Sequence, residues 1–243
     1  MNDIARRALV TGGSGAIGAA ICRRLAAAGR EVWVHAHRHL AAAESVVAAI
    51  RADGGQAHAI AFDVTDAAAS RAALEPLVEE HPVQILVNNA GVHDDAPFAG
   101  MSAEQWHRVI DVSLNGFHHV TQPVLLPMIR SRWGRIVNVT SIAGLLGNRG
   151  QVNYAAAKGA LHAATKALCL EVASRGITVN AVAPGVIATP MSATAFDEGR
   201  IAALVPMKRA GRADEVASLV GYLASDEAAY VTGQVIAVGG GLG

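Results

Sequence analysis

A tyrosine and a lysine four positions apart are the residues of this sequence best suited to proton chemistry. Tyr154 and Lys158 fall in an alanine-rich stretch typical of a helix, where i, i+4 spacing places both side chains on one face. An ammonium group there stabilises a phenolate, so a tyrosine with an ordinary pKa of about 10 could act as acid or base nearer neutrality. Taken alone, the pair could equally be a surface pair or a tyrosine packed against the core.

A glycine-rich turn near the start of the chain suggests what the tyrosine could serve. Residues 12–18 read Gly-Gly-Ser-Gly-Ala-Ile-Gly and connect an apolar run to an alanine-rich one. Glycines in such a turn let the backbone approach a pyrophosphate, and the following helix offers free N–H groups and its positive dipole end. A tight turn without ligand is the alternative for the motif by itself. Together with the tyrosine and lysine, the turn indicates hydride transfer between a nicotinamide and a carbonyl.

Short apolar runs alternate with alanine-rich segments along the chain and predict the elements that position these residues. Strands are expected at 7–10, 31–35, 57–62, 85–87, 134–139, 178–183 and 235–238, and helices at 17–28, 40–52, 67–80, 103–128, 154–175 and 214–223. This βαβ rhythm predicts an α/β fold of Rossmann type, a doubly wound parallel sheet with helices on both faces. No linker interrupts it, so we expect residues 1–243 to form a single domain.

Composition excludes several classes of function. Of the 243 residues, 52% are hydrophobic and 16% charged, and 20 basic residues balance 20 acidic ones, so we expect no nucleic-acid partner and no anionic membrane surface. No stretch reaches the roughly 18 apolar residues of a membrane span, and we expect a soluble, cytoplasmic protein. Cys22 and Cys169 lack any metal-binding spacing and are interpreted as buried, reduced thiols.

The order of motifs resembles the short-chain dehydrogenase/reductase family from Ala8 to Gly240. The matching stretches are 11–18, Asp63-Val64, Asn88-Asn89-Ala90-Gly91, Ser141, Tyr154 to Lys158, and Pro184-Gly185. The resemblance implies that Tyr154 donates a proton to the substrate carbonyl oxygen, that Ser141 hydrogen-bonds this oxygen, and that Lys158 binds the ribose and lowers the tyrosine pKa.

The sequence departs from the family at a fourth catalytic position, where Ser113 replaces an asparagine. Asn115, two residues on, faces another side of a helix. We expect an active enzyme with an altered proton relay.

The resemblance also implies a cofactor site. Its expected contacts are Gly12, Ser14, Gly15, Ile17, Gly18, His37, Arg38, Asp63, Val64, Asn89, Ala90, Gly91, Tyr154, Lys158, Pro184, Gly185, Ile187 and Thr189. After the second strand the chain reads His35-Ala36-His37-Arg38 without a carboxylate, which favours NADPH over NADH. Gly15 counts against this, because many NADP-using relatives carry arginine there. His35, His37 and His39 alternate like a metal-binding His-x-His, but the family uses no catalytic metal and we expect none.

Within the family, residues 147–154 and 173–180 look most like 3-oxoacyl-[acyl-carrier-protein] reductases, including ketoreductases of aryl polyene and related specialised pathways. This implies an acyl carrier protein or CoA thioester as substrate, a homotetramer, and a lid over the substrate at residues 187–210. Arg132, Arg135, Arg149 and Arg175 are candidate carrier contacts beside the entrance. Two alternatives stay open: a dehydrogenase of another small alcohol, sugar or steroid, and a non-catalytic dinucleotide-binding sensor or scaffold. Ser113 slightly favours the last, whereas the intact Ser141, Tyr154 and Lys158 argue against it.

Overall fold

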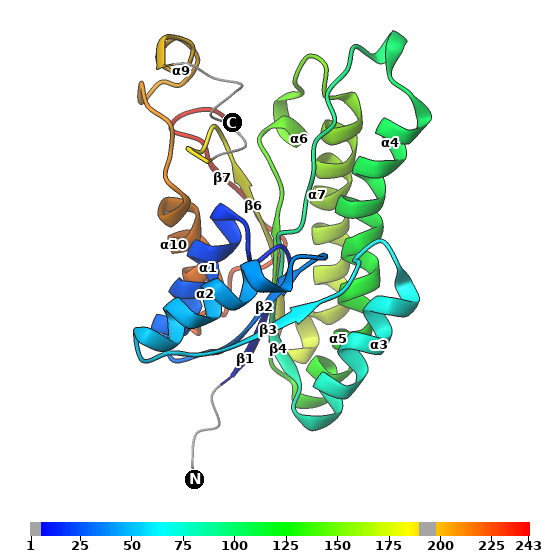
Figure 1. Ribbon diagram of the computed structural model, residues 1–243, viewed down its shortest axis with the longest axis vertical. Coiled ribbons are helices and arrows are strands. Elements are labelled where there is room, and N and C mark those ends of the chain that lie inside the picture. The colour runs from blue at the N-terminus through cyan, green and yellow to red at the C-terminus, as the bar shows by residue number, and fades with distance from the viewer. Residues whose placement is uncertain (1–5, 190–197) are drawn as a thin grey trace.

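Seven parallel strands form one sheet in the computed structural model, which describes residues 6–189 and 198–243 (Figure 1). The sheet order is β3-β2-β1-β4-β5-β6-β7, and each neighbouring pair is parallel. The strands are β1 (Arg7–Val10), β2 (Glu31–Ala36), β3 (Gln56–Ala61), β4 (Val83–Asn88), β5 (Gly134–Val139), β6 (Ile177–Pro184) and β7 (Val235–Val238). The order reverses between β1 and β4, which confirms the predicted doubly wound fold and places its ligand crevice at the carboxyl ends of the strands.

Helices cover both faces of this sheet, as Figure 1 shows. One face carries α1 (Ala16–Ala27), α2 (Leu40–Ala52) and α10 (Ala213–Leu223), and the other carries α3 (Ala67–Glu80), α5 (Gly116–Ser131) and α7 (Val152–Val172). Three further helices, α4 (Ala103–Ile110), α6 (Ala143–Leu146) and α9 (Glu198–Leu204), lie toward the carboxyl edge of the sheet. Short 3-10 turns at Phe98–Gly100 and Ala173–Arg175 complete the described elements.

Alternating side chains of the strands fill two separate cores. In β1, Ala8 and Val10 pack with α1, α2 and α10, whereas Leu9 between them packs with α3, α5 and α7. A fully buried parallel strand needs apolar residues on both faces, which explains the continuous apolar runs in the sequence. Cys22 lies in the first core and Cys169 in the second. Both are buried, free thiols, as expected.

The helix predicted at 103–128 is interrupted, which corrects the sequence interpretation. Between α4 and α5 the chain makes a π-helical turn at Asp111–Asn115, where the Gly116 N–H donates to the Asp111 carbonyl five residues earlier. The turn inserts one extra residue into the helical ladder, so the side chains of α4 and α5 are out of phase. α4 starts at a capping box formed by Ser102 and Gln105.

None of the helices described here is both long and apolar enough to cross a lipid bilayer.

Candidate active site

The glycine loop between β1 and α1 is shaped to receive an anionic group. Gly12 has a φ of 61°, which glycine adopts without penalty, and a Cβ on Gly18 would collide with the Gly12 carbonyl oxygen. α1 begins after Gly15 without a capping side chain and without an acidic residue in its first turn. Its first N–H groups are therefore free of helical partners and point to a site that fits a pyrophosphate.

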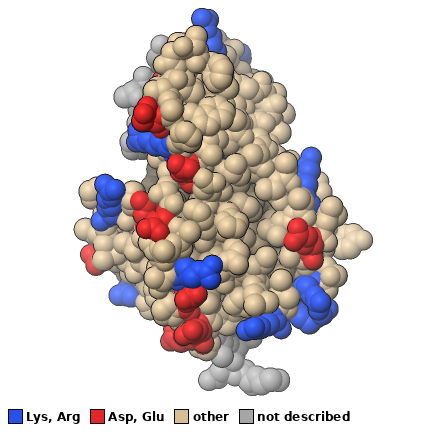
Figure 2. Space-filling view, turned by 90° about the vertical axis from the view of Figure 1, so that its right-hand side faces the viewer, with Lys and Arg blue, Asp and Glu red and all other residues tan. Residues whose placement is uncertain are grey.

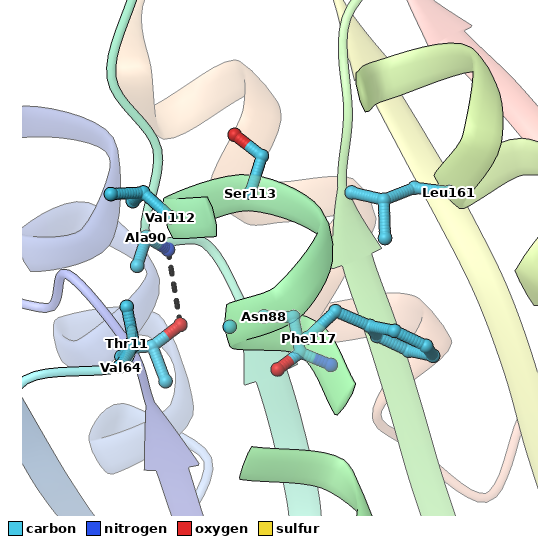
Figure 3. Close-up of a pocket in the computed structure, with 9 residues that line it drawn as sticks. Thr11, Val64, Asn88, Ala90, Val112, Ser113, Phe117 and Leu161 are labelled. Atoms are coloured by element: carbon cyan, nitrogen blue, oxygen red, sulfur yellow. Dashed lines mark hydrogen bonds between the residues drawn. The ribbon is translucent and has the colours of Figure 1, made fainter. Parts of the chain in front are cut away.

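Side chains from the strands on either side of β1 hold this loop. Asn89, after β4, donates from Nδ2 to the carbonyls of Thr11 (2.9 Å) and Gly12 (3.1 Å). From β2, His35 Nδ1 accepts the Gly12 N–H at 3.0 Å. The Thr11 hydroxyl accepts the Ala90 N–H at 3.0 Å (Figure 3). The backbone of the loop is thereby fixed by the protein itself.

His35 has a role that the sequence interpretation missed. Its side chain is buried, and Nε2 donates to the Phe62 carbonyl at 2.9 Å while Nδ1 accepts from Gly12. Both ring nitrogens are used by a neutral imidazole, and burial lowers the pKa of His35 to about 4. A lone histidine inside an apolar strand was the available signal, because such a residue needs hydrogen-bond partners.

The three alternating histidines do not converge. His37 and His39 are exposed beyond β2, and His37 Nε2 lies 3.1 Å from Asp63 Oδ2. Asp63 follows β3, accepts the Thr65 N–H and hydroxyl, and precedes the buried Val64. Among the described residues no three histidines, cysteines or carboxylates are grouped to hold a metal ion. His37, Arg38, Asp63 and Val64 all lie just beyond the carboxyl ends of β2 and β3, where a cofactor crossing the sheet edge would contact them.

Tyr154 and Lys158 share one face of α7, as predicted. Lys158 Nζ lies 5.6 Å from the centre of the Tyr154 ring and donates to the Val139 carbonyl at 3.0 Å. The lysine side chain is buried, and desolvation lowers its pKa to about 8. Its ammonium is also close to Gly91, where an added Cβ would lie 3.2 Å from Nζ. The structure therefore brings the predicted lysine together with the segment that follows β4.

The pKa of Tyr154 differs from the sequence prediction. Burial raises it, and the hydrogen bond with Ser141 only partly opposes this effect. Proximity of Lys158 was expected to lower the pKa, but the sequence carries no measure of how deeply the phenol is buried. A raised pKa keeps the phenol protonated at neutral pH, which is the form that donates a proton to a carbonyl. Ser141 follows β5 as predicted, and its Oγ also accepts the Ala143 N–H at 3.1 Å.

Ser113 lies on the π-helical turn and is buried, but its hydroxyl has no hydrogen-bond partner within the described chain. Beside it is a cavity of ≈ 10 Å³, about the space of one water molecule. The cavity is lined by Thr11, Val64, Asn88, Ala90, Val112, Ser113, Gly116, Phe117 and Leu161 (Figure 3). Asn115 is exposed and donates to Asp111 at 2.7 Å, so it does not replace the missing asparagine.

The last predicted cofactor contacts lie at the end of β6 and just beyond it, beside the loop that carries Ser141. The Pro184 carbonyl accepts the Ile142 N–H at 3.0 Å, and the Gly185 N–H donates to Val238 at 3.0 Å. Ile187 is buried and bridges to Gly211, and Thr189 is the last residue described before the gap. Of the predicted lid at 187–210, residues 190–197 lie outside the described chain.

The four candidate carrier-binding arginines do not gather at one place in the chain. Arg132 and Arg175 lie two residues before the starts of β5 and β6, at the sheet edge opposite Ser141. Arg135 is buried within β5 and donates to the carbonyls of Gly134 and Ser225, so its guanidinium is not available to a carrier. Only Arg149 is exposed at the active-site edge, between α6 and α7.

Comparison with known proteins identifies the family. Residues 6–199 match the family model described as short chain dehydrogenase. The chain belongs to the short-chain dehydrogenase family. It is therefore an oxidoreductase acting on a carbonyl or hydroxyl group, which argues against the non-catalytic sensor or scaffold.

Several relatives match nearly the whole chain of this short-chain dehydrogenase. The 3-oxoacyl-[acyl-carrier-protein] reductase FabG of Aggregatibacter actinomycetemcomitans is 45% identical, with 96% of this chain and 98% of the relative covered. An acetoacetyl-CoA reductase of Allochromatium vinosum is 41% identical over 98% of this chain and 99% of its own length. A solved structure, a putative gluconate dehydrogenase from Agrobacterium tumefaciens, superimposes with a TM-score of 0.94 at 33% identity, covering 98% of this chain and 95% of that one.

Proposed function

We propose that this chain reduces 3-oxoacyl thioesters of an acyl carrier protein or of CoA to 3-hydroxyacyl thioesters, with NADPH as reductant. The observation that carries the proposal is the convergence of Ser141, Tyr154 and Lys158 at the sheet edge where the glycine loop also ends. The names of the relatives supply the substrate class: reductases of 3-oxoacyl groups match this chain over nearly its entire length.

Each residue of the constellation has a role in this reaction. NADPH, when bound, supplies the hydride that adds to the carbonyl carbon. Tyr154 donates its phenolic proton to the carbonyl oxygen, and the Ser141 hydroxyl hydrogen-bonds the same oxygen. The Lys158 ammonium binds the ribose and offsets the negative charge left on the phenol. A proton from solvent then restores Tyr154 by a relay that passes the position of Ser113.

The cofactor would lie along the carboxyl edge of the sheet, because most of the predicted contacts lie at or just beyond the carboxyl ends of its strands. The glycine loop would hold the pyrophosphate, and Asp63 and Val64 the adenine. The full set proposed is Gly12, Ser14, Gly15, Ile17, Gly18, His37, Arg38, Asp63, Val64, Asn89, Ala90, Gly91, Tyr154, Lys158, Pro184, Gly185, Ile187 and Thr189.

The preference for NADPH rests on the residues that follow β2. No carboxylate ends this strand, and His37 and Arg38 are both exposed there. Arg38 forms no close ion pair with a described carboxylate, although its charge contributes to the lowered pKa of Asp63, and its exposed guanidinium could take a 2′-phosphate. Asp63 pairs with His37 instead, which leaves the carboxylate less available to a ribose hydroxyl.

The proposed substrate entrance combines exposed apolar side chains with an exposed arginine. Leu145 and Leu146 of α6 and Val152 at the start of α7 are exposed to 45%, 61% and 41% and lie within one short segment, which makes them candidates for an apolar contact surface. Arg149 lies in the sequence between them. An acyl chain with an acidic carrier suits this combination, and the segment 187–210 would close over it as a lid.

We also propose a homotetramer. Figure 2 shows a broad area without Lys, Arg, Asp or Glu on the face that α3, α4 and α5 cover, with charged residues mainly around it. Leu126 of α5 and Leu170 of α7 are exposed to 52% and 83%, and Tyr230, after α10, to 100%. Light scattering should give about four times the chain mass at micromolar concentration, and a monomer mass would contradict this assembly.

The test of the proposed function is the initial rate of nicotinamide oxidation with acetoacetyl-CoA and with an acetoacetyl carrier protein, run in parallel with NADPH and NADH. We expect turnover with NADPH at least about tenfold above NADH, the discrimination of one well-placed charge pair. Arg38→Ala should remove most of this discrimination, and Arg71→Ala, an exposed arginine on α3, should not.

The second enzyme reading, a dehydrogenase of another alcohol or sugar, is favoured by one finding, the structural relative named as a putative gluconate dehydrogenase. Gluconate with NADP⁺ and with NAD⁺ therefore belongs in the same experiment. Turnover of gluconate without turnover of either thioester would overturn the proposal.

A further inference from the structure

Asn153, the neighbour of Tyr154, is a fully buried polar residue to which the chemistry above gives no task. Its side chain is 0% exposed. Nδ2 donates to the backbone carbonyls of Asp94 (2.9 Å) and Gln105 (3.0 Å), and Oδ1 accepts the Tyr154 N–H at 2.8 Å. The buried amide thus donates twice and accepts once, each time with a backbone group of a different segment. Such a side chain specifies how the three segments pack together.

The bond to Tyr154 compensates for a helix start that has no cap. Tyr154 belongs to the first turn of α7, where N–H groups have no partner within the helix. Gln151, at the N-cap position, does not cap the turn, because its Oε1 already accepts Asn148 Nδ2 at 2.8 Å and its Nε2 donates to Asp95 Oδ2 at 2.8 Å. Asn153 supplies the missing acceptor, so the backbone of the tyrosine depends on this one side chain.

The other two bonds reach the segment that borders the nicotinamide site. Asp94 is three residues beyond Gly91, and Gln105 belongs to the capping box of α4. Gln105 Nε2 in turn donates to Asp94 Oδ1 at 2.8 Å, and the Ala96 N–H donates to Gly150 at 2.9 Å. The first turn of α7, the segment after β4 and α4 therefore form one hydrogen-bonded unit centred on Asn153.

We infer that Asn153 is a positioning residue for Tyr154: it fixes the first turn of α7 against the segment 89–96 and so sets where the phenol lies over the nicotinamide. It touches no reacting atom and acts through the backbone of its neighbour. The inference rests on the proposed role of Tyr154 as proton donor. A catalytic group displaced by about 1 Å can lose about 10²-fold in rate, which sets the size of the expected effect.

The test compares two buried asparagines. Asn180 in β6 is also 0% exposed, donates to the Val231 carbonyl at 2.7 Å and accepts the Gln234 N–H at 3.1 Å. Asn153→Ala and Asn180→Ala should both lower Tm by roughly 2–8 °C. Only Asn153→Ala should lower kcat, by about 10²-fold, with KM for NADPH within about threefold of the unchanged protein. Equal kcat in the two variants would overturn the inference.

A second variant covers the case in which Asn153→Ala does not fold. Asn153→Ser keeps a hydroxyl near the Tyr154 N–H but is too short to reach Asp94 and Gln105. We expect it to fold and to recover part of the lost kcat, because the serine hydroxyl again accepts the Tyr154 N–H. The two hydrogen bonds to the Asp94 and Gln105 carbonyls stay lost. A kcat equal to that of the unchanged protein would show that the bonds to Asp94 and Gln105 do not position the tyrosine.

Amide hydrogen exchange separates this inference from the proposed substrate. Faster exchange in peptides covering 93–97 and 152–156 is expected for Asn153→Ala, and in peptides covering 177–182 and 231–234 for Asn180→Ala. If the unchanged protein turns over no thioester, the proposed function fails while this measurement still decides the positioning role. Unchanged exchange at 93–97 and 152–156 would overturn it whatever the substrate.

Discussion

The glycine loop and the region of Lys158 and Ser113 differ in how their buried polar groups are hydrogen-bonded. At the loop, His35 takes the Gly12 N–H and Asn89 takes the carbonyls of Thr11 and Gly12. On the catalytic side, the buried ammonium of Lys158 contacts one carbonyl, and within the described chain the Ser113 hydroxyl has no partner. The protein itself pairs the Gly12 N–H and the Thr11 and Gly12 carbonyls of the loop, whereas the Ser113 hydroxyl is left without a partner in the described chain.

The difference separates binding from chemistry. A loop whose backbone is already fixed loses little conformational entropy when a ligand arrives, so its contacts contribute to affinity. Buried groups with shifted pKa values lower the stability of the fold, but they are the groups that respond to a substrate. Removal of the buried Lys158 ammonium should therefore lower the rate and raise the stability, whereas variants at the loop should weaken stability and cofactor affinity together.

Tyr154→Phe should give the largest effect. It removes only the phenolic oxygen, and we expect kcat to fall by about 10²–10⁴-fold, the usual contribution of a general acid. Cofactor affinity, measured by the change in nicotinamide fluorescence, should stay within about threefold because the loop is untouched. Tyr222→Phe, on α10, is the matched control and should retain full activity. Retained turnover in the Tyr154 variant would exclude the proposed proton donor.

Lys158→Met should abolish turnover and stabilise the fold. In the unfolded chain the lysine binds its proton up to a pH of about 10.5, and in the folded chain only up to about 8. Below pH 8 both states are charged and the folded state bears the full desolvation cost, about 3 kcal/mol for a shift of this size. Urea denaturation should show this gain at pH 7 and its loss by about pH 10.5. A Lys158→Met variant that is less stable at pH 7 would mean that the contacts of the ammonium in the folded chain outweigh its desolvation cost.

His35→Leu tests the loop. The Gly12 N–H and the Phe62 carbonyl would lose their partner, which should cost about 1–3 kcal/mol at pH 7 and weaken cofactor binding roughly tenfold. His58→Leu, a half-exposed histidine on β3, should change neither. Cofactor affinity equal to that of the unchanged protein would show that the loop holds its shape without the imidazole.

The same histidine predicts a pH dependence. Because its pKa is about 4 in the folded chain and about 6.5 when unfolded, its contribution to stability is complete above pH 6.5 and is lost as the pH falls toward 4. His35→Leu should therefore lose less stability than the unchanged protein between pH 7 and 5. Parallel curves in urea denaturation would contradict this.

Ser113→Ala should have the smallest effect. Removing a hydroxyl that has no partner among the described residues should leave the free energy of unfolding within about 0.5 kcal/mol and kcat within about threefold. The control is Thr121→Val, which removes a buried hydroxyl that accepts Asn88 Nδ2 at 3.1 Å and should cost about 1–3 kcal/mol. A large loss of kcat in the Ser113 variant would show that the hydroxyl itself belongs to the proton relay.

Local patterns predicted the fold correctly, since apolar runs locate the strands and glycine spacing locates the turn between β1 and α1. The π-helical turn was not predicted, because the one-residue shift that it makes in the apolar period cannot be recognised when the preceding helix, α4, has only 8 residues. The role of His35 depends on partners 23 and 27 residues away, and the raised pKa of Tyr154 depends on packing around it. The burial of Arg135 has the same origin, because an arginine in a strand gives no sign of the carbonyls that will receive it.

The all-parallel sheet also governs how fast the chain folds. Arg7 of β1 pairs with Glu31 on one side and with Val83 on the other. β1 therefore completes its pairing only when a segment 76 residues further along the chain is in place. No described strand pair is a hairpin. Each strand pair therefore forms only after a long loop has closed, and its hydrogen bonds offset the loop-closure entropy only at that point. A nascent chain therefore carries β1 with one open edge until β4 has left the ribosome. Refolding should be slow, and unpaired β1 is the edge at which two incomplete chains would aggregate.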